Sequence, residues 1–200
     1  GEFEAEVAEQ AFWDVIATQI VRSLHEFARQ QAEIGEDQRF FVGEAVKGLR
    51  LLDLMLREYD VVVTNPPYMN RGKMNKELKK LVDKASPEGK YDLYAAFIQR
   101  SLEYTQTQGY LGMLTMHSFM FLSSYEKLRQ EIRDQASILT VAHAGPGLFE
   151  VGNPGTLQTT AFVLHEASES KQRESQVGTY FRLVHATSGE DKRRLFEESL

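Results

Sequence analysis

Apolar and polar residues follow one another along this chain in two different periods. Residues 4–34 place apolar side chains near a helical spacing, and residues 43–58 continue with a second helical pattern. Residues 59–64, YDVVVT, are then predicted to be a strand, because their continuous apolar run of three valines is typical of a parallel strand buried on both faces. The chain is therefore predicted to begin with helices and to form its first strand at Tyr59.

Helices and strands alternate after this first strand. The patterns predict helices at 75–85, at 91–105 and from Ser123 or Ser124 to about 135, with strands at 109–116 and 138–142. Residues 143–156 are rich in glycine and contain two prolines, so we expect a loop there.

Two more strands, at 157–164 and 177–185, are expected to pair with each other, and a helix at 189–200 ends the pattern. This order predicts an α/β fold with a mixed sheet that has an antiparallel edge.

Composition narrows the chemistry that the chain can perform. Its 200 residues include no cysteine, which excludes disulfides, zinc–thiolate sites and a cysteine nucleophile. No apolar run is long enough to cross a membrane, and the first residues, GEFE, are acidic where a signal peptide would be basic. We therefore expect a cytoplasmic protein that has no membrane contact.

Basic residues gather in one segment, although the net charge of the whole chain is −6. Residues 71–90 hold 7 basic and 3 acidic side chains. A solvated, lysine-rich helix is the ordinary explanation for such a run. Because the run directly follows a candidate site, Arg71, Lys73 and Lys76 are also candidates for contacts with a nucleic-acid backbone.

That candidate site is the stretch Asn65-Pro66-Pro67-Tyr68, which ends the first strand. Proline fixes φ near −65°, lacks an N–H and keeps the preceding residue extended, so the stretch forms a stiff corner. The corner offers two acceptors, the Asn65 side-chain oxygen and the Pro66 carbonyl, beside the flat ring of Tyr68. Open α/β sheets bind ligands beyond the carboxyl ends of their strands, which is where this corner lies.

Two fixed acceptors beside an aromatic ring suit a planar group that carries an amine. If each acceptor takes one N–H, the nitrogen lone pair is left free to attack an electrophile. Stacking on Tyr68 would contribute roughly 1–3 kcal/mol per base. This chemistry needs no covalent enzyme intermediate, whereas methylation of a cytosine carbon would need the absent cysteine. The alternative is a turn that only ends a strand.

With these residues the chain resembles the adenine-specific DNA methyltransferases that carry an N-P-P-Y motif. Five later segments of the chain are similar to sequence blocks that follow this motif in the family. These segments are Asp92-Leu93-Tyr94 with Phe97-Ile98, residues 109–115, residues 117–120, Leu128-Arg129, and Phe149 with residues 158–162. The sequences TMHSFMFLSSYEKLR and LQTTAFVL most resemble those of the PglX methyltransferases of BREX phage-defence systems. The resemblance covers about residues 40–165 and extends to large fused restriction–modification methylases.

The resemblance implies transfer of a methyl group from S-adenosyl-L-methionine to the exocyclic amine of adenine in double-stranded DNA, after the base is flipped out. The implied residues are Asn65, Pro66, Pro67 and Tyr68 for catalysis, and Phe149 and Asp92 for the target base. Asp92 fits equally well as a carboxylate that the N-terminal dipole of a helix stabilises.

The family also implies a glycine-rich cofactor loop and an acidic residue ahead of the N-P-P-Y strand. Neither is found before residue 60, so we expect the cofactor motif to lie upstream of this chain. Residues 1–58 would be a helical segment. Residues 59–200 would be the C-terminal, target-base half of a Rossmann-like methyltransferase sheet in a longer restriction–modification or phage-defence protein. Double-stranded DNA and other defence-system proteins would be its partners.

Two other functions stay open. The corner binds an amide or amino group whatever carries it, so a methyltransferase acting on protein glutamine or on RNA would use the same residues. A non-catalytic DNA- or protein-recognition module of a defence complex is the second alternative. Under each hypothesis the outer edge of strand 60–64 lacks a neighbour, and we expect residues 1–56 or another chain to cover it.

The isolated chain is expected to bind S-adenosyl-L-methionine weakly and to transfer no methyl group, because the family's cofactor motif is not found in it. Titration calorimetry measures this directly, and a micromolar dissociation constant for the isolated chain would contradict the expectation.

Overall fold

The computed structural model describes residues 50–149, 157–167 and 175–200, with the single positions 22, 23, 26, 47, 48 and 173. The chain divides into two units, Gly1–Arg57 and Glu58–Leu200. In the first unit residues 50–55 are helical, as are the described single positions before them. The helix expected at 43–58 is confirmed over this range, and most of the helix expected at 4–34 lies outside the described residues.

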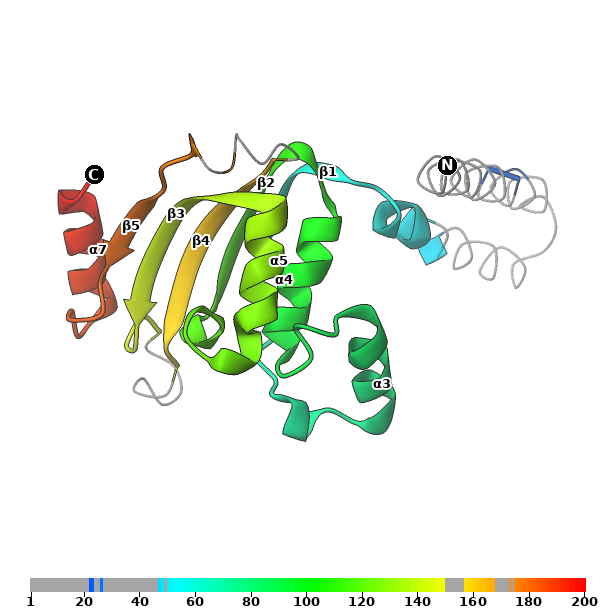
Figure 1. The fold of residues 1–200 in the computed structure, drawn as a ribbon, viewed down its shortest axis with the longest axis horizontal. Helices are drawn as coiled ribbons and strands as arrows, with labels where there is room; N and C mark the ends of the chain where they lie inside the picture. The colour runs from blue at the N-terminus through cyan, green and yellow to red at the C-terminus, as the bar shows by residue number, and fades with distance from the viewer. Residues whose placement is uncertain are drawn as a thin grey trace, which may run out of the picture. The chain divides into compact units, whose positions relative to one another are not determined.

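The described residues of the second unit form a mixed sheet of five strands (Figure 1). These strands are β1 (Tyr59–Thr64), β2 (Thr105–Met116), β3 (Ala136–Gly145), β4 (Thr159–Glu166) and β5 (Thr179–Arg182). Their spatial order is β1-β2-β4-β3-β5. β1 pairs in parallel with β2, β5 pairs in parallel with β3, and β4 runs antiparallel to both of its neighbours.

The mixed α/β sheet is confirmed, but its antiparallel strand lies inside the sheet and not at an edge. The predicted pairing of 157–164 with 177–185 is wrong, because β4 lies between β2 and β3 while β5 joins the far side of β3. Burial accounts for this placement. Phe162 and Leu164 of β4 are buried in the core, whereas Tyr180 of β5 is 64% exposed and suits an edge strand.

Two helices cover one face of the sheet (Figure 1). The described residues of this unit define from end to end the helices α3 (Lys76–Ala85), α4 (Leu93–Glu103), α5 (Glu126–Gln135) and α7 (Gly189–Glu198), with 3-10 turns η1 (Arg71–Lys73), η2 (His117–Met120) and η3 (Ser123–Tyr125). α4 packs on β2, and α5 packs on β3. Ile98, Leu111 and Leu128 are fully buried between these layers, each contributing about 1.5–3 kcal/mol. In the described part of the chain no helix is long and apolar enough to cross a membrane.

The cap of α5 and the burial of β1 also differ from the sequence-based expectations. No serine caps α5, because Ser123 belongs to η3 and the helix begins after Tyr125 without a side-chain cap. β1 is not buried on both faces, because it lies at the edge of the described sheet and exposes 58% of Val61 and 76% of Val63. The segment that was expected to cover this edge, residues 1–56, lies mostly outside the described residues.

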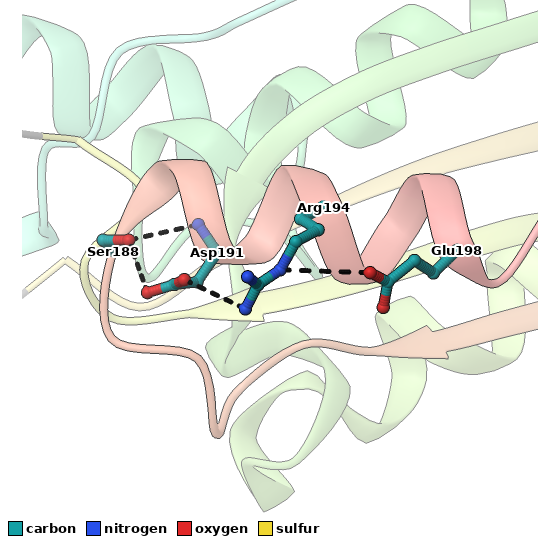
Figure 2. A network of polar contacts seen from close by, with 4 residues as sticks. All are labelled: Ser188, Asp191, Arg194 and Glu198. Carbon is teal, nitrogen blue, oxygen red and sulfur yellow. Dashed lines mark hydrogen bonds and ion pairs between the residues drawn. The ribbon is translucent and has the colours of Figure 1, made fainter.

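A polar network sets the beginning of α7 (Figure 2). Ser188 Oγ accepts from the backbone N of Asp191 at 3.1 Å and donates to its Oδ2 at 2.7 Å. Arg194 bridges Asp191 and Glu198, at 3.4 and 4.0 Å. The buried Lys192 donates through Nζ to two backbone carbonyls after β5 and so attaches the helix to the sheet. α7 ends at Glu198, so the helix expected at 189–200 is slightly shorter than predicted.

Candidate active site

The carboxyl ends of β1, β2 and β3 meet at one edge of the sheet, because these strands run in the same direction. Asn65 follows β1, His117 follows β2 and Pro146 follows β3, while the antiparallel β4 begins at this same edge with Thr159. A hydrogen bond from His117 N to Gln158 O, 2.8 Å long, joins two of these loops. The edge therefore gathers residues from four distant parts of the sequence.

The corner at residues 65–68 leaves β1 where the strand is held most firmly. Residues 61–64 pair continuously with β2 up to the corner. Pro66 is buried and anchors the turn, while Asn65 and Pro67 are exposed and Tyr68 is half-buried. The Asn65 amide is thus presented to solvent from a strand end that cannot shift without breaking the ladder to β2.

The Tyr68 hydroxyl lies between two acceptors, Asn65 Oδ1 at 3.1 Å and the Leu114 carbonyl at 3.2 Å. Burial raises the pKa of Tyr68, so the hydroxyl keeps its proton at neutral pH. A single proton can be donated to one acceptor at a time. When the hydroxyl donates to Leu114, the Asn65 oxygen is free to accept a hydrogen from an incoming amine.

The Tyr68 ring is held in one orientation by its neighbours. Its centroid lies 6.3 Å from that of Tyr94, and the two planes are almost perpendicular, at 88°. Tyr94 is itself fully buried, and its hydroxyl lies 2.8 Å from Ser118 Oγ in η2. The corner, α4 and the turn after β2 are therefore connected by one packed aromatic pair and one hydrogen bond.

Asp92 joins the corner to the first turn of α4. Its Oδ1 caps the helix by accepting from Tyr94 N at 3.4 Å, and the same oxygen accepts from Met69 N at 3.0 Å. Leu93 N donates in return to Met69 O at 2.9 Å. Burial raises the pKa of Asp92, against the lowering effect of these backbone donors. The contacts give Asp92 a structural role, and its contact with a target base stays a prediction.

The basic residues after the corner differ in how they are engaged. Arg71 forms a bidentate pair with Asp83 of α3, with N–O distances of 2.6 and 2.8 Å. This hydrogen bonding raises the pKa of Arg71 and lowers that of Asp83. Arg71 therefore ties η1 to α3 and has its charge matched. Lys73 and Lys76 are exposed and form no ion pair within the described part of the chain.

Phe149 lies half-buried at the end of the described part of the loop after β3. This loop begins after Gly145 and not at residue 143, because β3 is longer than predicted. Gly147 turns the chain with a φ of +79°, and a Cβ there would come within 2.7 Å of Thr187 O. Within the described part of the chain no hydrogen bond or ring contact joins Phe149 to the corner, so its role at the target base stays a prediction.

A histidine pair to which sequence reasoning assigned no role lies at the same edge. His117 Nδ1 and His143 Nε2 are 2.8 Å apart and share a hydrogen bond. Burial lowers the pKa of both rings, and for His143 the neighbouring His117, Arg182 and Lys192 lower it further. Both rings are therefore neutral at pH 7. The signal in the sequence was their position at the ends of two strands that later proved parallel.

An apolar hollow of about 540 Å³ begins beside the corner and extends over the sheet to α7. It is lined by Val63, Thr64, Asn65, Gly112, Met113, Leu114, Thr140, Ala142, Ala161, Phe162, Val163 and Phe196. No lining residue is charged, so the hollow lacks the carboxylate with which nucleotide sites hold a ribose. We therefore assign no cofactor ligands to the described residues. Nor do the described residues contain a group of three or more His, Asp or Glu side chains placed to hold a metal ion.

Comparison with known proteins gives a consistent family match. The model of the Eco57I restriction-modification methylase family matches residues 4–149. The adenine-specific methyltransferase PglX of Lacticaseibacillus casei is 38% identical over 148 residues, which are 74% of this chain and 12% of that protein. The adenine-specific methyltransferase BrxX of Escherichia coli is 33% identical over 158 residues, 79% of this chain and 13% of that protein. The chain thus spans about an eighth of the length of these relatives.

Solved structures share the fold at low sequence identity. A class I S-adenosylmethionine-dependent methyltransferase of Listeria monocytogenes superposes with a TM-score of 0.51 and 19% identity, over 72% of this chain and 42% of that chain. The DNA-bound Type ISP restriction-modification enzyme LlaBIII superposes with a TM-score of 0.53 and 13% identity, over 82% of this chain and 13% of that chain. These matches establish the mixed α/β fold of methyltransferases for the sheet described above.

Replacing Asp92 with alanine should loosen the corner as well as the helix. The variant loses the cap of α4 and the acceptor for Met69 N, so its free energy of unfolding should fall by about 1–2 kcal/mol in urea. Hydrogen exchange at the Met69 amide should also become faster. The Asp92→Asn variant keeps an acceptor oxygen, so its free energy of unfolding should fall by less than that of Asp92→Ala.

The exposed Asp134 of α5 supplies the control, since Asp134→Ala should change stability by less than about 0.5 kcal/mol. Because burial raises the pKa of Asp92, the part of its contribution that depends on protonation is present below the ordinary pKa of aspartate and is lost as pH rises through the raised pKa, while the two acceptor contacts remain. Asp92→Asn should remove this dependence. Unchanged Met69 exchange in Asp92→Ala would show that the carboxylate does not hold the corner.

Proposed function

We propose that this chain, which belongs to the family of Eco57I restriction-modification methylases, is the catalytic part of a larger enzyme that methylates the exocyclic amine of adenine in double-stranded DNA. The observation that carries the proposal is the corner at residues 65–68. It presents an exposed amide and a stiff carbonyl at the carboxyl end of a strand, in a sheet of the methyltransferase fold.

The corner would act by binding both hydrogens of the target amine. One N–H would donate to Asn65 Oδ1, which the Tyr68 hydroxyl releases when it donates to Leu114 O. The other would donate to the Pro66 carbonyl, which accepts no hydrogen bond from the described residues. Binding both hydrogens in this way makes the nitrogen more tetrahedral and directs its lone pair away from the corner.

S-adenosyl-L-methionine would supply the electrophilic methyl group, held by residues outside those described here. The chain's own contribution is to orient the amine, to stack the base against Tyr68, and to stabilise the positive charge that develops on the nitrogen. The Asn65 and Pro66 oxygens are suited to this last task, because their negative ends point toward the amine hydrogens. Phe149 and Asp92 would complete the base site from the loop after β3 and from the start of α4.

The basic face of α3 would hold the DNA backbone beside this site. Lys76, Lys80 and Lys84 recur every four residues and are all exposed, on the side of the helix opposite Leu78 and Val82. Like charges at this spacing destabilise a helix. A polyanion lying across the face would relieve the repulsion, and Lys73 in η1 would extend the contact toward the corner.

The longer protein would serve in restriction–modification, as the name of its relative RM.Eco57I indicates, or in phage defence, as its resemblance to the PglX methyltransferases implies. It would then act on DNA in the cytoplasm, together with other proteins of the defence system. A substrate screen with duplex DNA, RNA and glutamine-containing peptides separates this proposal from an enzyme that uses the same corner on another carrier. Transfer to none of these substrates would favour a non-catalytic recognition module.

Replacing Asn65 with alanine in the full-length protein should reduce methyl transfer to duplex DNA by about 100- to 1000-fold, because one of two amine acceptors is lost. Incorporation of a labelled methyl group measures the rate. DNA affinity should stay within about threefold, since the exposed amide would contact one base only.

Asn70→Ala is the matched control, because Asn70 is an exposed asparagine of the same loop whose side chain forms no hydrogen bond with the described residues. It should retain normal activity. If Asn65→Ala also modified adenine at the wild-type rate, the proposed role of the corner would be refuted.

The double variant Lys76→Gln/Lys80→Gln should bind DNA with a weaker dependence on salt. Each phosphate contact contributes about 0.9 to the slope of log K against log salt concentration, so the slope should fall by about 2. Fluorescence anisotropy over a series of salt concentrations gives this slope. Arg193→Gln/Arg194→Gln in α7 changes the net charge equally and should leave the slope unchanged. Equal slopes for the two double variants would exclude α3 from the DNA interface.

A further inference from the structure

Two large apolar side chains stand exposed at the carboxyl edge of the sheet, in the connection between η2 and η3. Phe121 is 58% exposed and Leu122 is 52% exposed. Only the short turn η2 separates them from the end of β2, so they belong to the same edge as the corner at residues 65–68. Neither residue takes part in the amine chemistry proposed above.

The connection is rigid before any ligand arrives. Phe121 N and Leu122 N both donate to the Ser118 carbonyl, at 3.2 and 3.0 Å. Arg129 of α5 also donates through Nη1 to the carbonyls of Phe119 and Leu122, at 2.8 and 2.7 Å. A flexible loop could fold such side chains away from water, whereas this one holds them outward.

The histidine pair supports the Phe121 ring. The ring centroid lies 5.3 Å from His117, at a plane angle of 79°, and 5.5 Å from His143, at 43°. The two imidazoles are tied to each other by their hydrogen bond of 2.8 Å. Phe121 therefore rests on a fixed aromatic base, while more than half of its surface stays exposed.

Packed aromatic side chains link the segment between η2 and η3 to the corner. The ring centroid of Phe119 in η2 lies 6.4 Å from that of Tyr94, and the Tyr94 ring contacts Tyr68 of the corner. The hydroxyl of Tyr94 also bonds to Ser118. The separation between Phe121 and the amine-binding residues is thus set by the core and does not depend on loop motion.

We propose that Phe121 inserts between DNA bases next to the extruded adenine, with Leu122 beside it, and occupies the space that the target base leaves. The proposal rests on the adenine-methylating function proposed above. Apolar wedges of this kind enter base steps in many DNA-bending proteins. An extruded base leaves a gap in the stack, and a rigid ring at a fixed distance from the amine-binding corner is suited to fill it.

Charge around the connection favours DNA over an apolar protein surface as its partner. The Arg129 guanidinium donates to two backbone carbonyls at the connection and so brings its positive charge there, whereas Lys127 in the same helix, α5, lies 3.6 Å from Glu88. The exposed Phe121 and Leu122 side chains, which we call the apolar tip, would contact stacked DNA bases, and the positive charge beside them would attract the flanking phosphates. Docking of another protein on this tip is the competing possibility, and the experiment below distinguishes the two.

The test compares two duplexes with the full-length protein. In one duplex the target adenine is paired with thymine, and in the other it faces an abasic site, which makes extrusion easier. Phe121→Ala should lower kcat/KM on the paired duplex by about 10- to 100-fold, because a stacking contact with a base is lost. On the abasic duplex the loss should be less than about threefold.

Two further variants separate the wedge from a structural role. Phe121→Trp keeps an aromatic ring and should retain most activity on the paired duplex. Phe97→Ala on α4 removes another exposed phenylalanine, 38% exposed, and should behave as wild type on both duplexes. An equal loss on both duplexes for Phe121→Ala, or no loss on either, would overturn the proposal and leave the tip to a protein partner.

A fluorescent base measures extrusion of the target base separately from methyl transfer. With 2-aminopurine at the target position, wild-type protein should raise the fluorescence on binding, and Phe121→Ala should raise it several-fold less. If wild-type protein extrudes the base but transfers no methyl group, the proposed function fails while the wedge stands. If Phe121→Ala extrudes the base as well as wild type does, the wedge is refuted whatever the methylation result.

Discussion

The site depends first on the Asp92 carboxylate, because one of its oxygens holds two separate pieces of the chain. It caps α4 through Tyr94 N and holds the loop after the corner through Met69 N. The prolines restrict φ within the corner, but they do not determine where the chain goes after Tyr68. That direction comes from the carboxylate, which converts a stiff turn into a positioned one.

Aromatic packing extends this order across the edge of the sheet. Tyr94 is completely buried and contacts Tyr68 on one side and Phe119 on another, while its hydroxyl reaches Ser118. Interiors packed in this way resist small displacements. A corner that binds an amine and a tip that enters DNA would both need such rigidity, since ordering them on binding would cost affinity and rate.

The distribution of charge matters more for the proposed DNA contact than the total. The chain is acidic overall, yet the acids near α3 are mostly engaged by cations from elsewhere. Asp83 is bound by Arg71, and Glu88 lies 3.6 Å from Lys127. The lysines of the outer face of α3 are left as a local positive field. At physiological ionic strength charges more than about 8 Å away are largely screened, so a phosphate at this face would respond to those lysines.

The sequence by itself determined the elements that depend on neighbouring residues. β1 and its corner follow from an apolar run that ends in two prolines, and α3 begins where Asn75 caps it. The helix at 91–105 was likewise foreseen, apart from two residues at each end, because its apolar period is local. The family resemblance rested on the same short stretches.

Only the tertiary structure decided which strands are neighbours and which polar side chains meet. The apolar pattern of β4 predicts a strand, but it does not specify which strands will pair with it. Its two neighbours in the sheet are β2 and β3, which both precede it in the sequence. The Arg71–Asp83 pair and the contact between His117 and His143 join residues 12 and 26 positions apart. Such contacts form because the folded sheet brings their backbones together, and no local pattern of hydrophobic and polar residues specifies that distance.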